Sequence, residues 1–170
     1  PDADIKAGSR NVSFYAANRG PNQGTGSWPG ESWKVGGATV WGWISYDPAL
    51  NLIYHGTSNP GPWNGAGRPG DNKWSASIIA RDADSGEIVW AFQPTPHDLW
   101  DYDAVNENIL VDLPLGGTTR KALVHFDRNG FAYTMDRATG EVILAKPYVP
   151  MNWSTGVDLK TGRPVLDTSK

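Results

Sequence analysis

The segment Ala80–Trp90, A-R-D-A-D-S-G-E-I-V-W, decides the fold. It reads as a strand, a tight D-x-x-S-G turn and a second strand that ends on a large aromatic residue. In such a turn the Asp82 carboxylate accepts hydrogen bonds from nearby backbone N–H groups, and Gly86 takes the positive φ that closes the hairpin. The second strand then carries Trp90 inward. The segment therefore predicts an antiparallel hairpin with a buried indole.

The same pattern recurs twice further along the chain. Residues 134–144, T-M-D-R-A-T-G-E-V-I-L, repeat it with Leu144 at the aromatic position, and V-D-L-K-T-G-R at 157–163 is a weaker echo. Hairpin units that recur in this way stack radially into the blades of a β-propeller. Because closure needs about four to eight blades, three copies predict an arc of roughly two to four blades.

Runs rich in β-branched and aromatic residues, separated by Gly and Pro, predict a meander of antiparallel strands. Residues 1–37 are instead rich in Gly, Pro, Asn and Ser, which predicts a long irregular segment. We therefore expect an all-β chain, with an irregular segment at 1–37 and propeller blades at 38–170. The strands are expected at 40–46, 51–56, 77–82, 87–92, 107–113, 121–126, 131–136 and 141–146.

Composition supports this class and excludes several others. The 170 residues include 20 Gly, 13 Pro and 9 Trp, which is typical of short strands joined by many turns. There are 15 Lys and Arg against 18 Asp and Glu, without a basic run, which argues against nucleic acid or an anionic membrane as partner. No Cys is present, so any metal must be held by oxygen or imidazole donors. The spacing of His55, His97 and His125 does not match a zinc site.

The beginning of the chain, P-D-A-D-I-K, carries no initiator Met, charged leader or apolar targeting segment. Nor does the sequence contain an apolar run of the length that a membrane-spanning helix needs. We therefore expect an internal piece of a longer protein, without a membrane segment of its own. Length alone is compatible with one ordinary domain as well as with part of a larger one.

Several further motifs follow one another in a recognisable order. Together with the A-x-D-x-x-S-G-x-x-x-W unit they resemble the quinoprotein alcohol dehydrogenases, most closely the methanol dehydrogenase type, which use pyrroloquinoline quinone (PQQ). This resemblance implies an arc of an eight-bladed propeller braced by tryptophan-docking motifs, in which the Trp90 indole lies between blades and its N–H meets a backbone carbonyl. The motifs are G-G-A-T-V-W-G-W at 36–43, G-T-S-N-P-G-P-W-N at 56–64, R-P-G-D-N-K-W at 68–74, P-H-D-L-W-D-Y-D at 96–103 and H-F-D-R-N-G at 125–130.

The resemblance implies a cofactor site built from three of these residues. Trp41 is expected to stack under the flat quinone, and Thr39 to hydrogen-bond the cofactor from the same face of a strand. Arg128 is expected to bind the ortho-quinone oxygens and to stabilise the negative charge that develops on reduction. The alternatives are core packing for the W-G-W tryptophans, Trp43 above all, and a surface ion pair of Arg128 with Asp127.

The resemblance also implies a metal site. Asn59, held by the proline that follows it, matches an amide-oxygen ligand, and Asp101 matches a carboxylate that both adjoins the metal and takes the hydroxyl proton of the substrate. Asp103 is typical of the lanthanide-dependent relatives. In an extended segment residues 101 and 103 share a face, and a trivalent ion gains more from an added carboxylate than calcium does. Paired Asp residues in a solvated turn are the alternative, and we interpret His97 and Asp98 as positioning residues.

The implied reaction is oxidation of a primary alcohol, methanol or another short-chain alcohol, by hydride transfer to metal-bound PQQ. The resemblance further implies a lanthanide ion, with calcium as the alternative, and a cytochrome c-type electron acceptor. It also implies a periplasmic location and a homodimeric parent protein. A Cys pair and a further metal-binding carboxylate are expected in the parent protein outside these residues. A non-catalytic propeller acting as an assembly scaffold is the main alternative, although a scaffold has no reason to keep the cofactor and metal residues together. A carbohydrate-active enzyme using Asp98 and Asp101 is a weaker one.

Overall fold

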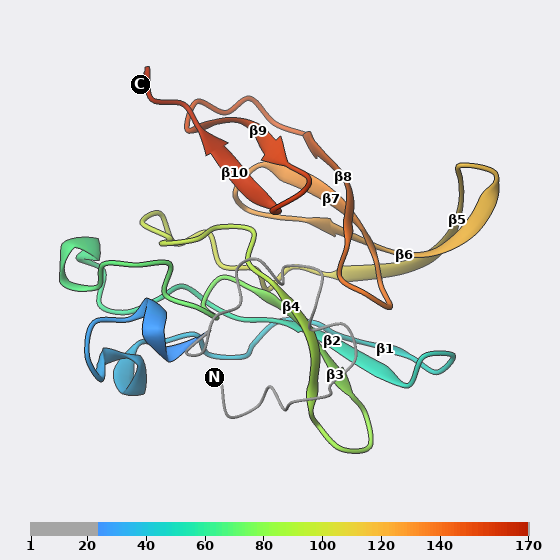
Figure 1. Ribbon diagram of the computed structural model, residues 1–170, viewed down its shortest axis with the longest axis horizontal. Helices are drawn as coiled ribbons and strands as arrows, with labels where there is room; N and C mark the ends of the chain where they lie inside the picture. Colours follow the sequence, from blue (N-terminus) through green and yellow to red (C-terminus); the bar gives the residue numbers. More distant parts are fainter. Residues whose placement is uncertain (1–23, 170) are drawn as a thin grey trace.

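The computed structural model describes residues 24–169; residues 1–23, which make up most of the predicted irregular segment, and residue 170 lie outside it. Two four-stranded antiparallel sheets and one two-stranded hairpin make up the strands of the described residues (Figure 1). The first blade consists of β1 (Ile44–Asp47), β2 (Leu52–Gly56), β3 (Ile78–Asp82) and β4 (Ile88–Phe92). The second blade consists of β5 (Asn108–Leu115), β6 (Thr118–Phe126), β7 (Phe131–Asp136) and β8 (Val142–Pro147), and the hairpin of β9 (Ser154–Asp158) and β10 (Arg163–Leu166).

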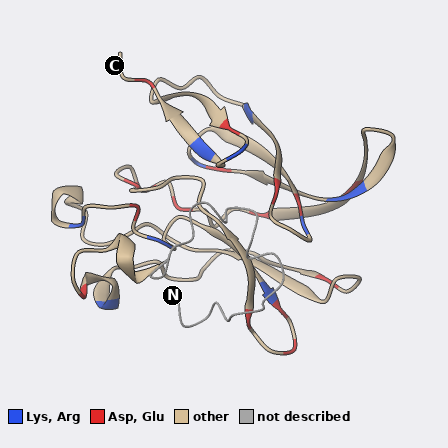
Figure 2. Cartoon of the chain, viewed as in Figure 1, with Lys and Arg blue, Asp and Glu red and all other residues tan. Residues whose placement is uncertain are grey.

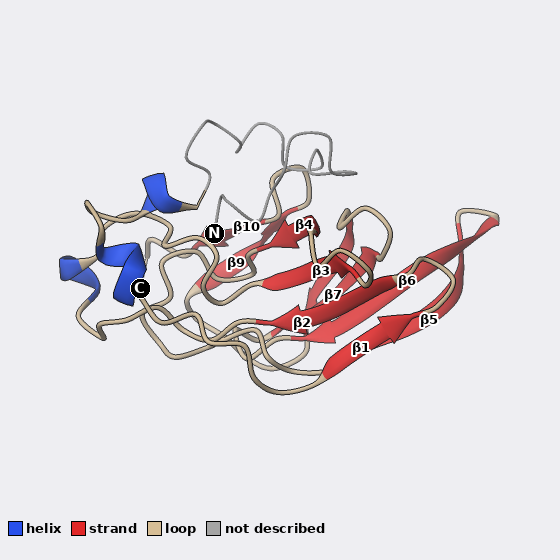
Figure 3. Cartoon of the chain, turned by 90° about the horizontal axis from the view of Figure 1, so that it is seen from below, coloured by secondary structure: helices blue, strands red, loops and turns tan. Residues whose placement is uncertain are grey.

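Strand order is sequential in both blades, β1-β2-β3-β4 and β5-β6-β7-β8, so each blade is a simple meander. Short 3-10 helices occur at η3 (Thr25–Ser27), η4 (Ser32–Val35) and η5 (Gly65–Gly67). Figure 3 shows these helices and the long loops gathered at one end of the strands. Charged residues lie mainly in the turns and loops of both blades (Figure 2). Within residues 24–169, no helix has the length and apolar character needed to cross a membrane.

The strands predicted from residue 51 onward all form, with small shifts at their ends, but the run predicted at 40–46 was wrong in its first half. Strand β1 begins only at Ile44. Gly42 has a φ of +85°, and a Cβ placed there would lie 2.3 Å from the Val105 carbonyl oxygen. The close approach of another backbone therefore bends the chain where a strand was expected. As a consequence Thr39 and Trp41 do not share a strand face.

The turn chemistry of the repeated hairpins is confirmed. In all three copies the Asp carboxylate accepts hydrogen bonds of 2.9 to 3.1 Å from backbone N–H groups two or three residues later. The glycine that closes each turn has a φ between +70° and +79°. These positive angles favour glycine because they place a Cβ too close to the following carbonyl. The glycines are Gly86, Gly140 and Gly162.

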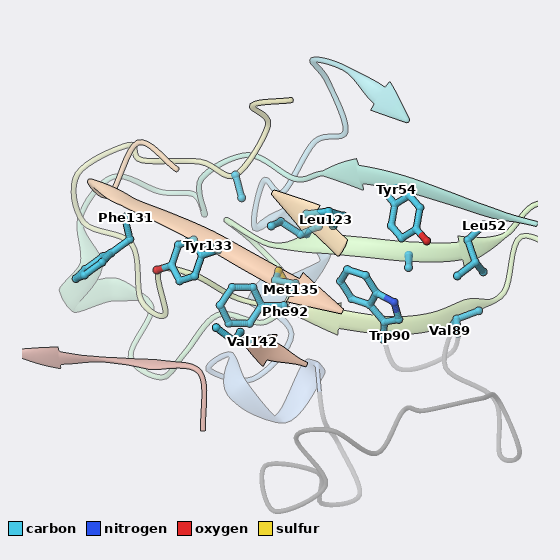
Figure 4. Close-up of a cluster of buried hydrophobic side chains, with 13 residues drawn as sticks. Leu52, Tyr54, Val89, Trp90, Phe92, Leu123, Phe131, Tyr133, Met135 and Val142 are labelled. Carbon is cyan, nitrogen blue, oxygen red and sulfur yellow. The ribbon is translucent and has the colours of Figure 1, made fainter. Parts of the chain in front are cut away.

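Trp90 fills the interface between the two blades. Its side chain is 2% exposed, and its Nε1–H donates to the carbonyl oxygen of Arg137 in the β7–β8 turn at 3.1 Å. A Cβ on Gly140 would lie 2.8 Å from the Trp90 ring, so the glycine of the second repeat also makes room for the indole of the first. Figure 4 shows Trp90 among buried side chains of both blades, including Tyr54 and Met135. The expected docking of the indole between blades is therefore confirmed.

Arg137 adds a buried ion pair to the same interface. Its guanidinium donates to Asp47 at the end of β1 and to Asp112 on β5, both at 2.6 Å. Its carbonyl oxygen also accepts the Tyr54 hydroxyl at 2.9 Å. Although burial raises the pKa of Asp47, the hydrogen bond and the charge of Arg137 hold that pKa below its ordinary value. The two blades are thus joined by an apolar cluster with a charged pair at one end.

Candidate active site

The predicted site residues lie on loops at one end of the strands. Because the strands of a meander alternate in direction, the start of β1 and the ends of β2 and β4 lie at the same end of the first blade. Asn59 follows β2, and Asp101 and Asp103 lie in the connection from β4 to β5. Arg128 lies in the β6–β7 turn of the second blade. Three loops that are far apart in the sequence thus present these four residues.

Asp103 lies at the centre of this group. Its side chain is 3% exposed. One carboxylate oxygen accepts the backbone N–H of Asn59, and the other accepts Arg128 Nη1–H at 2.9 Å. Arg128 Nη2 also lies 3.9 Å from an Asp101 carboxylate oxygen. Loops from both blades therefore meet through one buried carboxylate and one guanidinium.

Asp101 differs from Asp103 in its exposure. Its side chain is 41% exposed and that of Arg128 is 45% exposed. The Asp101 carboxylate is thus open to a small molecule, whereas the Asp103 carboxylate is not. The predicted alternative of a surface ion pair between Arg128 and Asp127 is wrong. Asp127 is fully buried and is bound by the side chain of His125 and the backbone N–H of Asn129.

The expectation that residues 101 and 103 share a face of an extended segment was also wrong. Asp101 has a φ of +63° and Asp103 a φ of +56°, which is left-handed backbone. Asp98 explains this conformation: its carboxylate accepts the backbone N–H groups of residues 100 and 102 at 2.8 Å and of residue 103 at 3.3 Å. The loop therefore folds around the buried Asp98 carboxylate, and the carboxylates of Asp101 and Asp103 both still reach Arg128.

These contacts show that Asp98 supports the loop, which agrees with its interpretation as a positioning residue. Its side chain is 1% exposed and its oxygens are occupied by backbone N–H groups. A glycosidase would need two carboxylates that face a sugar from opposite sides. Since the Asp98 carboxylate points into its own loop, the carbohydrate-active alternative does not fit the structure.

Several carboxylates lie close together around the Asp98–Asp103 loop. Burial raises the pKa of Asp103; the hydrogen bond from Asn59 lowers it, and the charge of Asp101 raises it further. Burial likewise raises the pKa of Asp98, with the charge of Asp127 acting in the same direction. A cation beside these carboxylates would lower the free energy of their charged forms. The Arg128 guanidinium already acts in this direction, because its charge lowers the pKa of Asp103.

The chemistry of the donors fits a hard cation. Asp101 and Asp103 would supply carboxylate oxygens and the Asn59 side-chain amide would supply a carbonyl oxygen, since its NH2 group donates to the Pro60 oxygen at 3.1 Å. Oxygen donors of these kinds suit calcium and similar ions. Within the described residues no group of three or more His, Asp or Glu side chains is arranged to hold a metal ion.

Thr39 and Trp41 lie in the segment that runs beside Asn59. The Thr39 backbone is bound to Ser58 at both its N–H and its carbonyl, each at 2.9 Å, and Ala38 N–H donates to the Asn59 carbonyl at 3.1 Å. Trp41 is 51% exposed. Trp43 is 66% exposed, which contradicts core packing for it among residues 24–169.

Comparison with known proteins shows the family of the chain. The PQQ β-propeller domain model of glucose, ethanol and alcohol dehydrogenases matches residues 3–159. The chain belongs to the PQQ β-propeller family. The resemblance drawn from the motifs is thus confirmed, and so is the all-β propeller class.

The relatives of this PQQ propeller chain are dehydrogenases. It is 53% identical to the lanthanide-dependent methanol dehydrogenase of Methylacidiphilum fumariolicum, over 97% of this chain and 27% of that protein. It is 53% identical to methanol dehydrogenase (cytochrome c) subunit 1 of Methylorubrum extorquens, over 85% of this chain and 23% of that protein. The solved structure of a europium-containing methanol dehydrogenase matches with a TM-score of 0.90 and 52% identity, over 96% of this chain and 28% of that one. The chain thus spans less than a third of these relatives.

Two residues that shape the candidate site were missed at the level of sequence. Asp127, in the H-F-D-R-N-G motif, is bound to His125 Nε2 at 3.1 Å and to Asn129 N–H at 2.9 Å, and so shapes the turn that presents Arg128. Arg68, in the R-P-G-D-N-K-W motif, is 1% exposed and contacts the Asp98 loop. Both motifs had been recognised, but no spacing rule separates a buried charge from an exposed one.

Proposed function

We propose that the protein containing this chain oxidises a primary alcohol, methanol or another short-chain alcohol, to the aldehyde, using PQQ together with a lanthanide ion. The observation that carries the proposal is that three loops bring the backbone of Asn59, the carboxylates of Asp101 and Asp103 and the guanidinium of Arg128 together. The names of the dehydrogenase relatives support it. A non-catalytic scaffold would not need this convergence, so the scaffold alternative is not favoured.

Each cofactor residue has a role that its placement supports. Trp41, with its exposed ring, would lie under the quinone, and Thr39 would donate a hydrogen bond to it. Arg128 would bind the quinone oxygens and stabilise negative charge there, because a planar guanidinium presents several N–H donors in a fixed geometry. When bound, PQQ supplies a carbonyl carbon that accepts hydride and that a neighbouring cation makes more electrophilic.

Asp101 and Asp103 have different proposed roles. Asp101, exposed and beside the Arg128 guanidinium, would take the hydroxyl proton of the alcohol and also contact the metal. Asp103, buried at the centre, would hold the metal together with the amide oxygen of Asn59. A buried carboxylate cannot reach the substrate, so the base is assigned to Asp101.

The added charge of Asp103 is the basis for proposing a lanthanide. Coulomb attraction grows with the charge of the ion, whereas the cost of desolvating the carboxylate is the same for either metal. An extra carboxylate therefore favours a trivalent ion over calcium. The names of a lanthanide-dependent relative and a europium-containing structure support this choice. Calcium is the alternative metal.

The finer features of the parent protein are proposals as well. A relative named methanol dehydrogenase (cytochrome c) subunit 1 supports a cytochrome c-type electron acceptor. A periplasmic location and a homodimeric parent rest on family resemblance. The division of the chain into an irregular segment at 1–37 and blades at 38–170 also remains a proposal.

Alcohol oxidation by the full-length protein tests this function. With PQQ and lanthanum present, we expect Asp101→Asn to lower kcat about 10²–10⁴-fold, the usual contribution of a general base, with an unchanged melting temperature. Glu107→Gln, which changes an exposed carboxylate outside the site, serves as the control and should keep full activity. Near-normal turnover of the Asp101 variant would show that the base is assigned wrongly.

A further inference from the structure

Arg68 is a buried charge that the proposed reaction does not use. It is 1% exposed, and each of its three guanidinium nitrogens donates one hydrogen bond. Nε donates to the Pro62 carbonyl at 2.7 Å, Nη1 to Asn72 Oδ1 at 2.8 Å and Nη2 to the Asp98 carbonyl at 2.7 Å. All three nitrogens of the guanidinium are therefore hydrogen-bonded, to acceptors from three separate places in the chain.

Two of these acceptors belong to the loops that carry the proposed metal donors. Pro62 lies three residues after Asn59, and Asp98 begins the turn that ends at Asp103. The same loops meet again where the Asn59 N–H donates to the Asp103 carboxylate. Arg68 thus forms a second connection between the two loops, in addition to their direct contact.

Asp98 transmits this connection to the donors. Its carbonyl accepts from Arg68, while its carboxylate accepts from backbone N–H groups of residues 100, 102 and 103. Those bonds hold Asp101 and Asp103 in left-handed backbone, a conformation that residues other than glycine rarely adopt. A shift of Asp98 would therefore move both carboxylates.

The chemistry of Arg68 suits a spacer of fixed geometry. Burying a charge is costly unless other charges and hydrogen bonds compensate it. Burial lowers the pKa of Arg68, and the nearby charge of Asp98 opposes that shift. A guanidinium donates in fixed planar directions, whereas a lysine ammonium is a single point donor. The planar group therefore fixes the relative positions of its acceptors.

We propose that Arg68, acting through Asp98, is a positioning residue that sets the spacing of the two loops carrying the metal donors. This inference rests on the proposed metal-dependent function. Residues that orient metal ligands without touching the metal affect metal affinity, and their substitution typically lowers metal affinity or activity about 10–100-fold. A residue with only a local structural role would lower the melting temperature and leave metal affinity unchanged.

The test uses the full-length protein, freed of metal and titrated with terbium ion alone, with sensitised terbium luminescence as the readout. Arg68→Lys keeps the charge but not the planar geometry, and we expect it to weaken terbium binding about tenfold or more. Arg137→Lys is the matched control, because Arg137 is also a buried arginine that binds an aspartate, but at the opposite end of the blades. It should lower the melting temperature and leave terbium affinity within about twofold of the wild type.

Asp98→Asn provides a second variant if Arg68→Lys does not fold. It keeps the carbonyl that binds Arg68 but removes one carboxylate oxygen, and it too should weaken terbium binding. Wild-type affinity in both folded variants, or in Asp98→Asn when only that variant folds, would overturn the positioning role. If the wild type binds no terbium, or Asp103→Asn binds as tightly as the wild type, the proposed metal site itself fails. The two failures are therefore distinguishable.

Discussion

Gly140→Ala offers a sharp test of how the blades are joined, because Gly86→Ala is a control within the same chain. Both glycines close the turn of a repeat, with φ values of +79° and +73°. A Cβ on Gly140 would lie 2.8 Å from the Trp90 ring, whereas at Gly86 no atom lies within 4 Å. The two substitutions therefore carry the same backbone strain and differ in one contact.

The size of the difference follows from these contacts. Left-handed backbone at alanine costs roughly 1–2 kcal/mol in either position. The clash with a ring that is only 2% exposed should add about 1–3 kcal/mol for Gly140→Ala, the usual cost of overpacking. The ring has little room to move, because its N–H is also bound to the Arg137 carbonyl. Gly140→Ala should thus be the more destabilising change.

Urea unfolding of the full-length protein, followed by tryptophan fluorescence, measures how much each glycine substitution lowers the free energy of unfolding. The excess for Gly140→Ala should disappear in a Trp90→Ala background, since the clash is then absent. That background itself should cost about 3–5 kcal/mol through lost packing. Equal losses for the two glycine variants, or an excess that persists without the indole, would refute the proposed contact between the repeats.

Two further predictions concern charge. The pKa of Asp47 is held below its ordinary value, so the Asp47 carboxylate binds a proton less tightly in the folded state than in the unfolded state. Its contribution to the free energy of unfolding is therefore fully present above the ordinary pKa and is lost as the pH falls through the lower pKa of the folded state. Asp47→Asn should flatten acid unfolding curves in this range, and an unchanged pH dependence would contradict it. Asp103→Ala should weaken lanthanum-supported alcohol oxidation more than calcium-supported oxidation in separate metal titrations of the apo-protein with PQQ; an equal effect on both would make the second aspartate incidental to metal choice.

Sequence predicted the parts of the fold that depend on nearby residues. The hairpin turns follow from an aspartate and a glycine four residues apart, as at Asp82 and Gly86, and need no distant partner. The burial of Trp90 depends on the second blade, but it was still predictable, because the second copy of the repeat supplies Gly140, which makes room for the indole. The irregular path around Gly42 was not, since it is caused by the approach of Val105 from another part of the chain.

The candidate site was predictable in its membership but not in its geometry. The motifs supplied Asn59, Asp101 and Arg128, yet the left-handed backbone around Asp101 depends on hydrogen bonds to the buried Asp98 carboxylate. Arg68 was missed because its acceptors come from three separate places in the chain. A buried charge of this kind is recognised only when the loops are seen together.

The measurement that tests the central claim most directly is anomalous diffraction from crystals of the full-length protein, grown with a lanthanide and PQQ and recorded at the lanthanide absorption edge. We predict one strong anomalous peak about 2.3–2.6 Å from the side-chain oxygens of Asn59, Asp101 and Asp103, the range typical of hard cations with oxygen ligands. A peak elsewhere, or a peak at the site to which neither Asn59 nor Asp103 contributes an oxygen, would contradict the account.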